Sequence, residues 1–89
     1  MHELSLMADI LRKIEDVARQ QGASRVISVR VRLGALSHIS ADHFREHFEH
    51  ACRGTVAEHA SLIIELDTDP GRPWAQDVVL ESVEIEQSS

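Results

Sequence analysis

Apolar positions near the start of the chain recur with the period of an α-helix. The stripe advances in steps of four, three and four residues through Met7, Leu11, Ile14 and Ala18, while charged residues occupy the opposite side. Ser5 is a candidate N-cap, and Gly22 supplies the left-handed residue that commonly closes a helix. The pattern therefore predicts a helix from Ser5 to Gln21.

The next segment, Arg25 to Leu33, alternates between apolar and polar positions. One parity holds Ile27, Val29, Val31 and Leu33, and the other holds Ser28, Arg30 and Arg32. Strict alternation is typical of a strand with one buried face and one face in water. We therefore expect helices to cover only one side of the sheet.

Helical spacing returns after Ser40, a second candidate N-cap. A helix from Ala41 to Arg53, closed by Gly54, would bury the apolar positions Phe44, Phe48, Ala51 and Cys52. The following Thr55-x-x-Glu58 has the form of a capping box that starts a single helical turn.

The last third of the chain predicts two more strands. Leu62, Ile64 and Leu66 alternate with Ile63 and Glu65, which indicates the second strand. Asp69-Pro70-Gly71-Arg72 then fits a type II turn, with proline second and glycine third. The predicted order of elements is therefore α-β-α-β-β.

The third strand, Val78 to Glu86, changes phase along its length. Val78 and Leu80 share one parity and Val83 and Ile85 the other, which predicts a bulge near Glu81-Ser82. With Val83 and Ile85 inward, Glu84 and Glu86 face water, as Arg30 and Arg32 do. Because opposite charges pair across neighbouring strands, we expect the first and third strands to be adjacent.

Composition narrows the class of protein. The 89 residues form one domain, and a net charge of −6 argues against nucleic acid or an anionic membrane as the main partner. The single cysteine excludes an internal disulfide and a cysteine-rich zinc site. No signal peptide or membrane-length apolar run is present in the sequence, so the expected location is the cytoplasm.

The first three residues, Met1-His2-Glu3, are the strongest candidate for chemistry. A histidine at position two places an α-amine, a backbone amide nitrogen and an imidazole side by side. Around one metal ion these nitrogens close two fused chelate rings, and a fourth donor completes a square plane of the kind that suits Ni(II) or Cu(II). The bulky His2 is expected to keep the start methionine in place. The alternative is that His2 is an ordinary residue on a frayed terminus.

A second group of histidines, His43, His47 and His50, flanks the apolar face of the predicted second helix. A zinc metalloprotease helix would read His-Glu-x-x-His, but here Phe44 follows the first histidine, where the general base would stand. We therefore favour a solvated histidine-rich flank over a metal site. With no nucleophile–base pair or phosphate-binding loop either, nothing in the sequence indicates an enzyme.

These features together resemble the HypA/HybF family of hydrogenase nickel-insertion accessory proteins. The resemblance rests on Met-His-Glu-Leu-Ser-Leu at the start, Val-Arg-Leu-Gly-Ala-Leu-Ser around Gly34, and Cys-Arg-Gly-Thr-Val-Ala-Glu from Cys52 to Glu58. The strand segments Leu-Ile-Ile-Glu and Ser-Val-Glu-Ile-Glu also match.

The resemblance implies a mixed α/β fold with two helices packed on one face of a three-stranded mixed sheet. It implies that His2 ligates nickel, with the Met1 amine and the backbone amides of His2 and Glu3 as co-ligands. The Glu3 side chain would be a functional neighbour of the metal. Implied partners are the nickel-handling GTPase HypB and the large subunit of a [NiFe]-hydrogenase.

One departure from the family is large. Its members carry a zinc domain with two Cys-x-x-Cys pairs between the last two strands, whereas here Thr68 to Asp77 contains no cysteine. We therefore expect no zinc, and a short linker, 68–77, within a single nickel-binding domain, 1–89. The sequence predicts a nickel metallochaperone or its isolated nickel-binding core. The alternative is an interaction module that keeps the fold and protein contacts without delivering metal.

Overall fold

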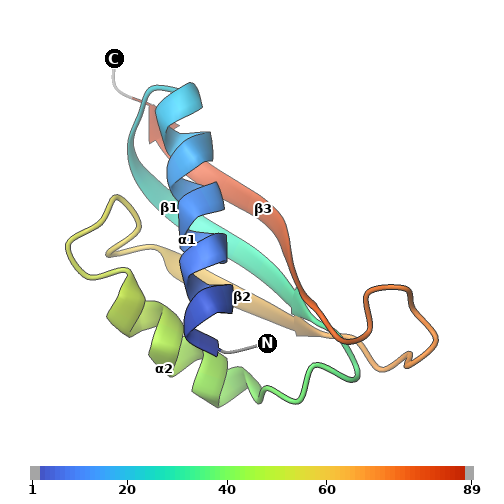
Figure 1. The fold of residues 1–89 in the computed structure, drawn as a ribbon. Helices are drawn as coiled ribbons and strands as arrows, with labels where there is room; N and C mark the ends of the chain where they lie inside the picture. Colours follow the sequence, from blue (N-terminus) through green and yellow to red (C-terminus); the bar gives the residue numbers. More distant parts are fainter. Residues whose placement is uncertain (1–2, 88–89) are drawn as a thin grey trace.

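The computed structural model describes residues 3–87 and contains the five predicted elements in the predicted order (Figure 1). They are α1 (Glu3–Gln20), β1 (Ala23–Leu33), α2 (Ala41–Ala51), β2 (Ser61–Leu66) and β3 (Val78–Gln87).

The strands form one sheet in the order β2-β1-β3. β1 runs parallel to β2, and the chain passes between them through α2, which is the crossover that a parallel pair requires. β1 runs antiparallel to β3, so the predicted adjacency of the first and third strands is confirmed.

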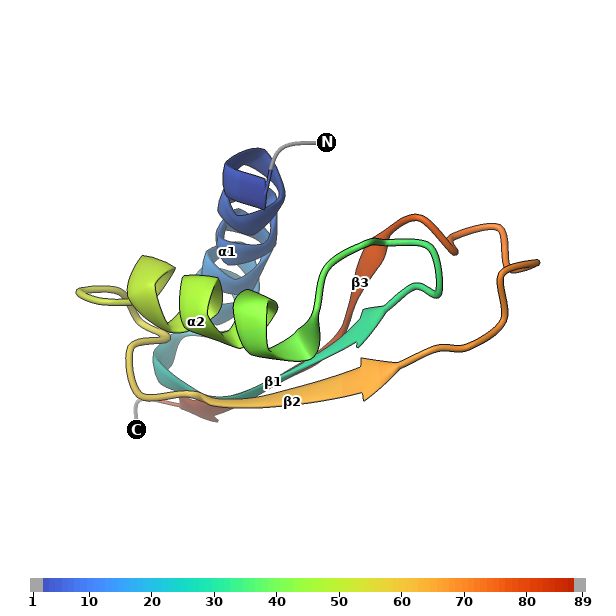
Figure 2. The same cartoon turned by 90° about the horizontal axis from the view of Figure 1, so that it is seen from below.

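Both helices cover the same face of the sheet, and the other face is open (Figure 2). The core between the layers is apolar, and the described residues include no buried polar or charged side chain. Its largest fully buried members are Phe44, Phe48, Ile14, Leu33 and Val26. The predicted fold class, two helices on one face of a three-stranded mixed sheet, is confirmed.

Helix α1 begins two residues earlier than predicted, at Glu3. Ser5 is therefore an exposed residue inside the helix, and its prediction as the N-cap is wrong. The predicted end of the helix, Gln21, is one residue past the observed end, Gln20. Gly22 closes the helix with a φ of 64°, and its N–H donates to the carbonyl of Arg19.

The predicted inward parity of β1 is wrong in its first half. Val26 is 2% exposed and Ile27 is 39% exposed, the reverse of the expected arrangement. The cause is an irregularity in the pairing with β3, whose register shifts between Val26 and Ser28. One extra residue at this point exchanges the two faces.

The predicted bulge in β3 is confirmed. Arg30 pairs with Ser82 and Val31 pairs with Leu80, which leaves Glu81 as the extra residue. The bulge restores the inward parity, so that Leu80 and Val83 both pack against the core.

Helix α2 has the predicted N-cap. The Ser40 hydroxyl accepts a hydrogen bond from the backbone N–H of His43 at 3.1 Å. The helix ends at Ala51, two residues earlier than expected, and Gly54 follows with a φ of 78°. Segment 55–58 forms turns and not a helical turn, with the Thr55 hydroxyl accepting from the N–H of Ala57 at 3.2 Å.

The structure contains the predicted turn at Asp69 to Arg72, but the predicted turn type is wrong. A type II turn requires a positive φ at its third residue, and Gly71 does not have one. Instead, the Asp69 carboxylate accepts a hydrogen bond from the N–H of Gly71 at 2.9 Å. This contact between an aspartate side chain and the backbone two residues later is an Asx turn.

Candidate metal centre

The predicted nickel chelate, Met1-His2-Glu3, ends at the residue with which α1 begins. Met1 and His2 are outside the described residues, and of Glu3 the structure describes the backbone, as the first residue of the helix. The chelate therefore stays a prediction. The structure describes the residues that surround the first turn of α1.

The first two turns of α1 share a small cavity with α2. Leu6 and Met7 line it from α1, and Ile39, His43, Phe44 and His47 complete its wall. Two buried phenylalanines fix α2 in this position, Phe44 and Phe48, whose rings stack with centroids 6.2 Å apart. Two of the three histidines that the sequence singled out thus lie beside the helix that begins at Glu3.

The histidines of the α2 stripe line two surface depressions, and His47 belongs to both. His43 and His47 line the small cavity against α1, with ring centroids 4.5 Å apart, and His47 and His50 line a second depression with Glu46 and Glu49. Within residues 3–87, no group of three or more histidine, cysteine or acidic side chains is arranged to hold a metal ion. The stripe is therefore not a complete site by itself in the part of the chain that the structure describes.

A second histidine environment was not predicted. His38 has a φ of 60°, a left-handed conformation that is uncommon for a residue with a side chain. It lines a wide groove together with Leu6 and Asp9 of α1 and with Asp77 and neighbouring residues before β3. The loop before β3 lines the same groove through Gln76 and Asp77.

Cys52 is not part of a metal or nucleophilic site. It is 1% exposed, and burial, with a smaller effect of the Glu15 carboxylate, raises the pKa of its thiol to about 11. A neutral thiol is neither a good metal ligand nor a nucleophile. The prediction that Cys52 is a small buried hydrophobe is confirmed.

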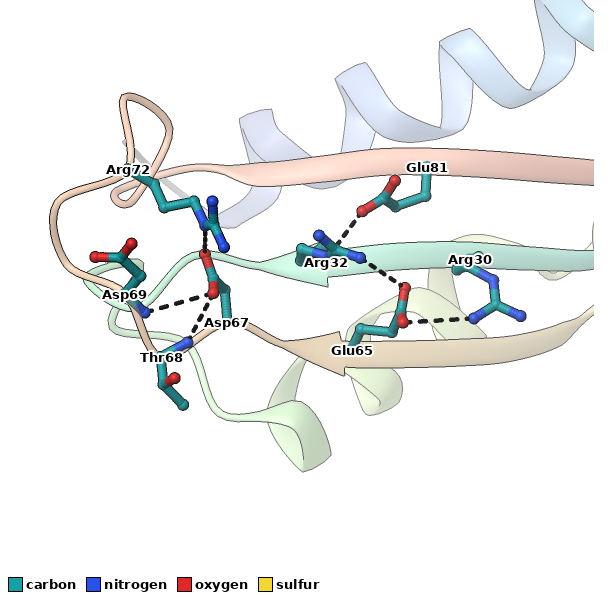
Figure 3. A network of polar contacts seen from close by, with 8 residues as sticks. All are labelled: Arg30, Arg32, Glu65, Asp67, Thr68, Asp69, Arg72 and Glu81. Atoms are coloured by element: carbon teal, nitrogen blue, oxygen red, sulfur yellow. Dashed lines mark hydrogen bonds and ion pairs between the residues drawn. The ribbon is translucent and has the colours of Figure 1, made fainter.

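The open face of the sheet carries a chain of ion pairs, shown in Figure 3. Arg32 lies between two carboxylates, 2.8 Å from Glu81 and 3.4 Å from Glu65, and Arg30 also reaches Glu65 at 3.6 Å. Glu84 and Glu86, which the sequence suggested as partners of these arginines, have other contacts. The register places Glu84 opposite Ser28 and Glu86 opposite Arg25. Because the carboxylates of Glu65 and Glu81 are both paired with arginines, this cluster has a structural role.

Polar contacts within residues 67–72 hold together the first part of the linker before β3 (Figure 3). Asp67 accepts from Arg72 Nε at 2.8 Å and from the N–H groups of Thr68 and Asp69. The pKa of Asp67 is below its ordinary value, since desolvation, which would raise it, is outweighed by these hydrogen bonds and by the positive charge of Arg72. The guanidinium groups of Arg72 and Arg32 both lie over the Trp74 ring, 5.7 Å and 5.9 Å from its centroid.

The described residues form a small α/β domain in which two helices pack on one face of a three-stranded mixed sheet. The family described as "Hydrogenase/urease nickel incorporation, metallochaperone, hypA" matches residues 1–74. This chain belongs to the HypA family, as its resemblance predicted, and metallochaperones are accessory proteins and not catalysts.

Relatives named as hydrogenase maturation factors support the assignment. The chain is 42% identical over 77 residues to "Hydrogenase maturation factor HypA" of Rhizobium leguminosarum bv. viciae, covering 86% of this chain and 66% of that protein. It is 44% identical over 74 residues to the protein of the same name in Methylocella silvestris, covering 83% and 64%. The chain thus spans about two thirds of the length of these relatives.

A solved structure has the same fold. The "Solution structure of the Ni metallochaperone HypA from Helicobacter pylori" superimposes with a TM-score of 0.84 over 99% of this chain and 100% of that chain, at 19% sequence identity. This likeness establishes the shared arrangement of helices and strands.

No helix within residues 3–87 is long and apolar enough to cross a membrane.

Proposed function

We propose that this chain is a single nickel-binding domain that holds Ni(II) at Met1-His2-Glu3 and delivers it for [NiFe]-hydrogenase maturation. The observation that carries the proposal is the family match, which starts at residue 1 and so includes the three chelating residues. The His2 imidazole, the Met1 amine and the backbone amides of His2 and Glu3 are the proposed donors.

The start of α1 supports this donor set. The first four N–H groups of a helix have no acceptor within the helix, so the Glu3 amide, at the first position of α1, is not needed for the helical hydrogen bonds. A metal ion that displaces an amide proton here leaves the rest of the helix intact. The chelate and the fold are therefore compatible at the residue where they meet.

A chelate at the very start of a chain favours transfer over storage, because incoming ligands reach the metal without unfolding the protein. Affinity for nitrogen ligands rises from nickel to copper, so selectivity must come from the supply of metal and from the proteins that exchange it. The proposed partners are the GTPase HypB and the large subunit of a [NiFe]-hydrogenase.

The test is a nickel titration of the untagged protein, with His2→Ala and an N-terminally extended form beside it. We expect one yellow, diamagnetic Ni(II) per chain in the parent protein and no such complex in either altered form. Neither change alters a residue of the described range 3–87, so the melting temperature should hardly move. If the His2→Ala variant keeps one nickel with unchanged affinity, the chelate is not the site.

A second candidate is an interaction module that keeps the fold without delivering metal. It is favoured by the cysteine-free linker 68–77 and by the two-thirds coverage of the relatives. Failure of the untagged parent protein to bind nickel, together with retained binding to HypB, would support this alternative.

A further inference from the structure

The outer edge of β3 is open along the first part of the strand. β3 pairs only with β1, and the Gly34 N–H donates to the Asp77 carbonyl, so the backbone of Asp77 points toward β1. Because these directions alternate along a strand, the N–H and C=O groups of Val78 and Leu80 point away from β1. Within residues 3–87 no other segment forms hydrogen bonds with them. Before the bulge at Glu81, β3 therefore presents unpaired backbone donors and acceptors.

The other edge of the sheet, β2, is covered in part by a helix. The Arg45 side chain of α2 donates to the Leu62 carbonyl at 3.0 Å, and α2 packs alongside β2 (Figure 1). Proteins commonly cover or blunt the edges of their sheets, because an uncovered edge pairs readily with another strand. The start of β3 lacks such a cover among the described residues, which favours an added strand at this edge.

A groove runs beside this edge, between α1 and the start of β3. Its volume, about 860 Å³, is within the usual range of binding clefts, about 300–1,000 Å³. The apolar residues that line it are Leu6, Ile10, Leu36, Ile39, Val78 and Leu80. A strand added to β3 would place every second side chain on the helix-covered face of the sheet, where this groove lies.

The two ends of the groove carry opposite charges. Asp77 lies at one end, just before β3, and α1 and β3 run in the same general direction in Figure 1, so Lys13 lies toward the other end. Both side chains are exposed, and within the described residues neither forms an ion pair. Asp9, between them, is paired with Arg12. The groove therefore favours a segment with a basic residue near Asp77 and an acidic residue near Lys13.

We propose that the groove and the free edge of β3 together bind an extended segment of a partner protein as an added antiparallel strand. The segment has two apolar residues opposite Val78 and Leu80, an acidic residue on their N-terminal side and a basic residue on their C-terminal side. Backbone hydrogen bonds give such a complex its affinity, and the alternate side chains give it specificity. The antiparallel direction follows because antiparallel pairs are slightly more stable per residue than parallel ones.

A second copy of this chain does not fit the same edge. β3 contains Glu81, Glu84 and Glu86 and no basic residue, so two copies of β3 would bring like charges together. The proposed surface lies outside Met1-His2-Glu3 and does not depend on the nickel chelate.

The experiment titrates the untagged protein with the synthetic peptide Glu-Thr-Val-Thr-Val-Thr-Lys, blocked at both ends, and follows amide exchange by NMR. With the peptide at about ten times its Kd, the amides of Val78 and Leu80 should exchange about 10-fold more slowly, because exchange then requires release of the peptide. Val79 is the internal control, since its backbone faces β1. The same peptide N-methylated at both valines lacks the two donors and should not bind detectably.

A charge exchange tests the direction of binding. The parent protein should bind the original peptide about 3- to 10-fold more tightly than the reversed peptide Lys-Thr-Val-Thr-Val-Thr-Glu, the effect of two exposed ion pairs. Lys13→Glu/Asp77→Lys should show the opposite preference. The matched control is Arg53→Glu/Glu58→Lys, which exchanges two exposed charges outside the groove and should keep the parent preference. All four positions are exposed, so the melting temperatures should hardly change.

Four results overturn the proposal: no binding of the original peptide, binding without protection of Val78 and Leu80, equal binding of the N-methylated peptide, or an unchanged preference in Lys13→Glu/Asp77→Lys. Protection of the two amides by self-association without peptide also overturns it, because the occupant would then be a second copy. Nickel titration of the same variant keeps this inference apart from the proposed function. The variant retains Met1-His2-Glu3, so its nickel affinity should equal that of the parent whether or not the peptide binds.

Discussion

A side chain at position 34 would collide with the backbone at position 75. A Cβ built on Gly34 comes within 2.2 Å of the carbonyl oxygen of Ala75, far inside van der Waals contact. The approach is close because the Gly34 N–H donates to Asp77 at 2.9 Å and the Leu36 N–H donates to Ala75 at 2.7 Å. The linker before β3 is thus fastened to the end of β1 by backbone contacts that only glycine permits.

Gly34→Ala should destabilise the protein by about 1–3 kcal/mol, the usual cost of forcing extra volume into a packed site. Urea denaturation measures the change. Gly71→Ala is the control, because a Cβ there meets only the flexible Asp69 carboxylate, at 3.2 Å. Equal stability of Gly34→Ala and the parent would mean that the linker is not docked as described.

Asp67→Asn should destabilise the protein at neutral pH and progressively less in acid. The pKa of Asp67 is lowered in the folded state, so its stabilising effect is present above the unfolded value, about 3.9, and is lost as pH falls through the folded value. Urea titrations of parent and variant from pH 7 down to about 3 check this. A difference between parent and variant that stays constant down to pH 3 would contradict the lowered pKa of Asp67.

Cys52 should resist thiol reagents until the protein unfolds. Its thiol is 1% exposed and its pKa is raised to about 11, so both access and thiolate formation are suppressed. At pH 8 we expect modification at least about 100-fold slower in the folded protein than in the urea-denatured one, since reaction requires opening of the core. Comparable rates in the two states would contradict burial of Cys52.

Purified protein should hold no stoichiometric zinc. The sequence has one cysteine, so the paired thiolates of a structural zinc site are absent. Metal analysis should find less than one zinc per chain, and a chelator should leave the melting temperature unchanged. One tightly held zinc per chain would refute this and direct attention to His43, His47 and His50.

The sequence by itself determined the features that depend on near neighbours along the chain. Period 3.6 and period 2 identified all five elements and their order, because a single buried face imposes these spacings. The sequence also predicted the Ser40 cap and the bulge at Glu81. A cap depends on residues three positions apart, and a bulge changes the alternation pattern within a single strand. The family followed from short motifs that stand in the sequence itself.

Tertiary structure decided what depends on partners far along the chain. The outward turn of Ile27 follows from the register with β3, and Arg32 pairs with Glu65 and Glu81 because both edge strands flank β1. The place of His43 and His47 beside α1 follows in the same way from the packing of both helices on one sheet face. Sequence spacing gives the direction of a side chain from its own element, but only packing determines which other element that side chain meets.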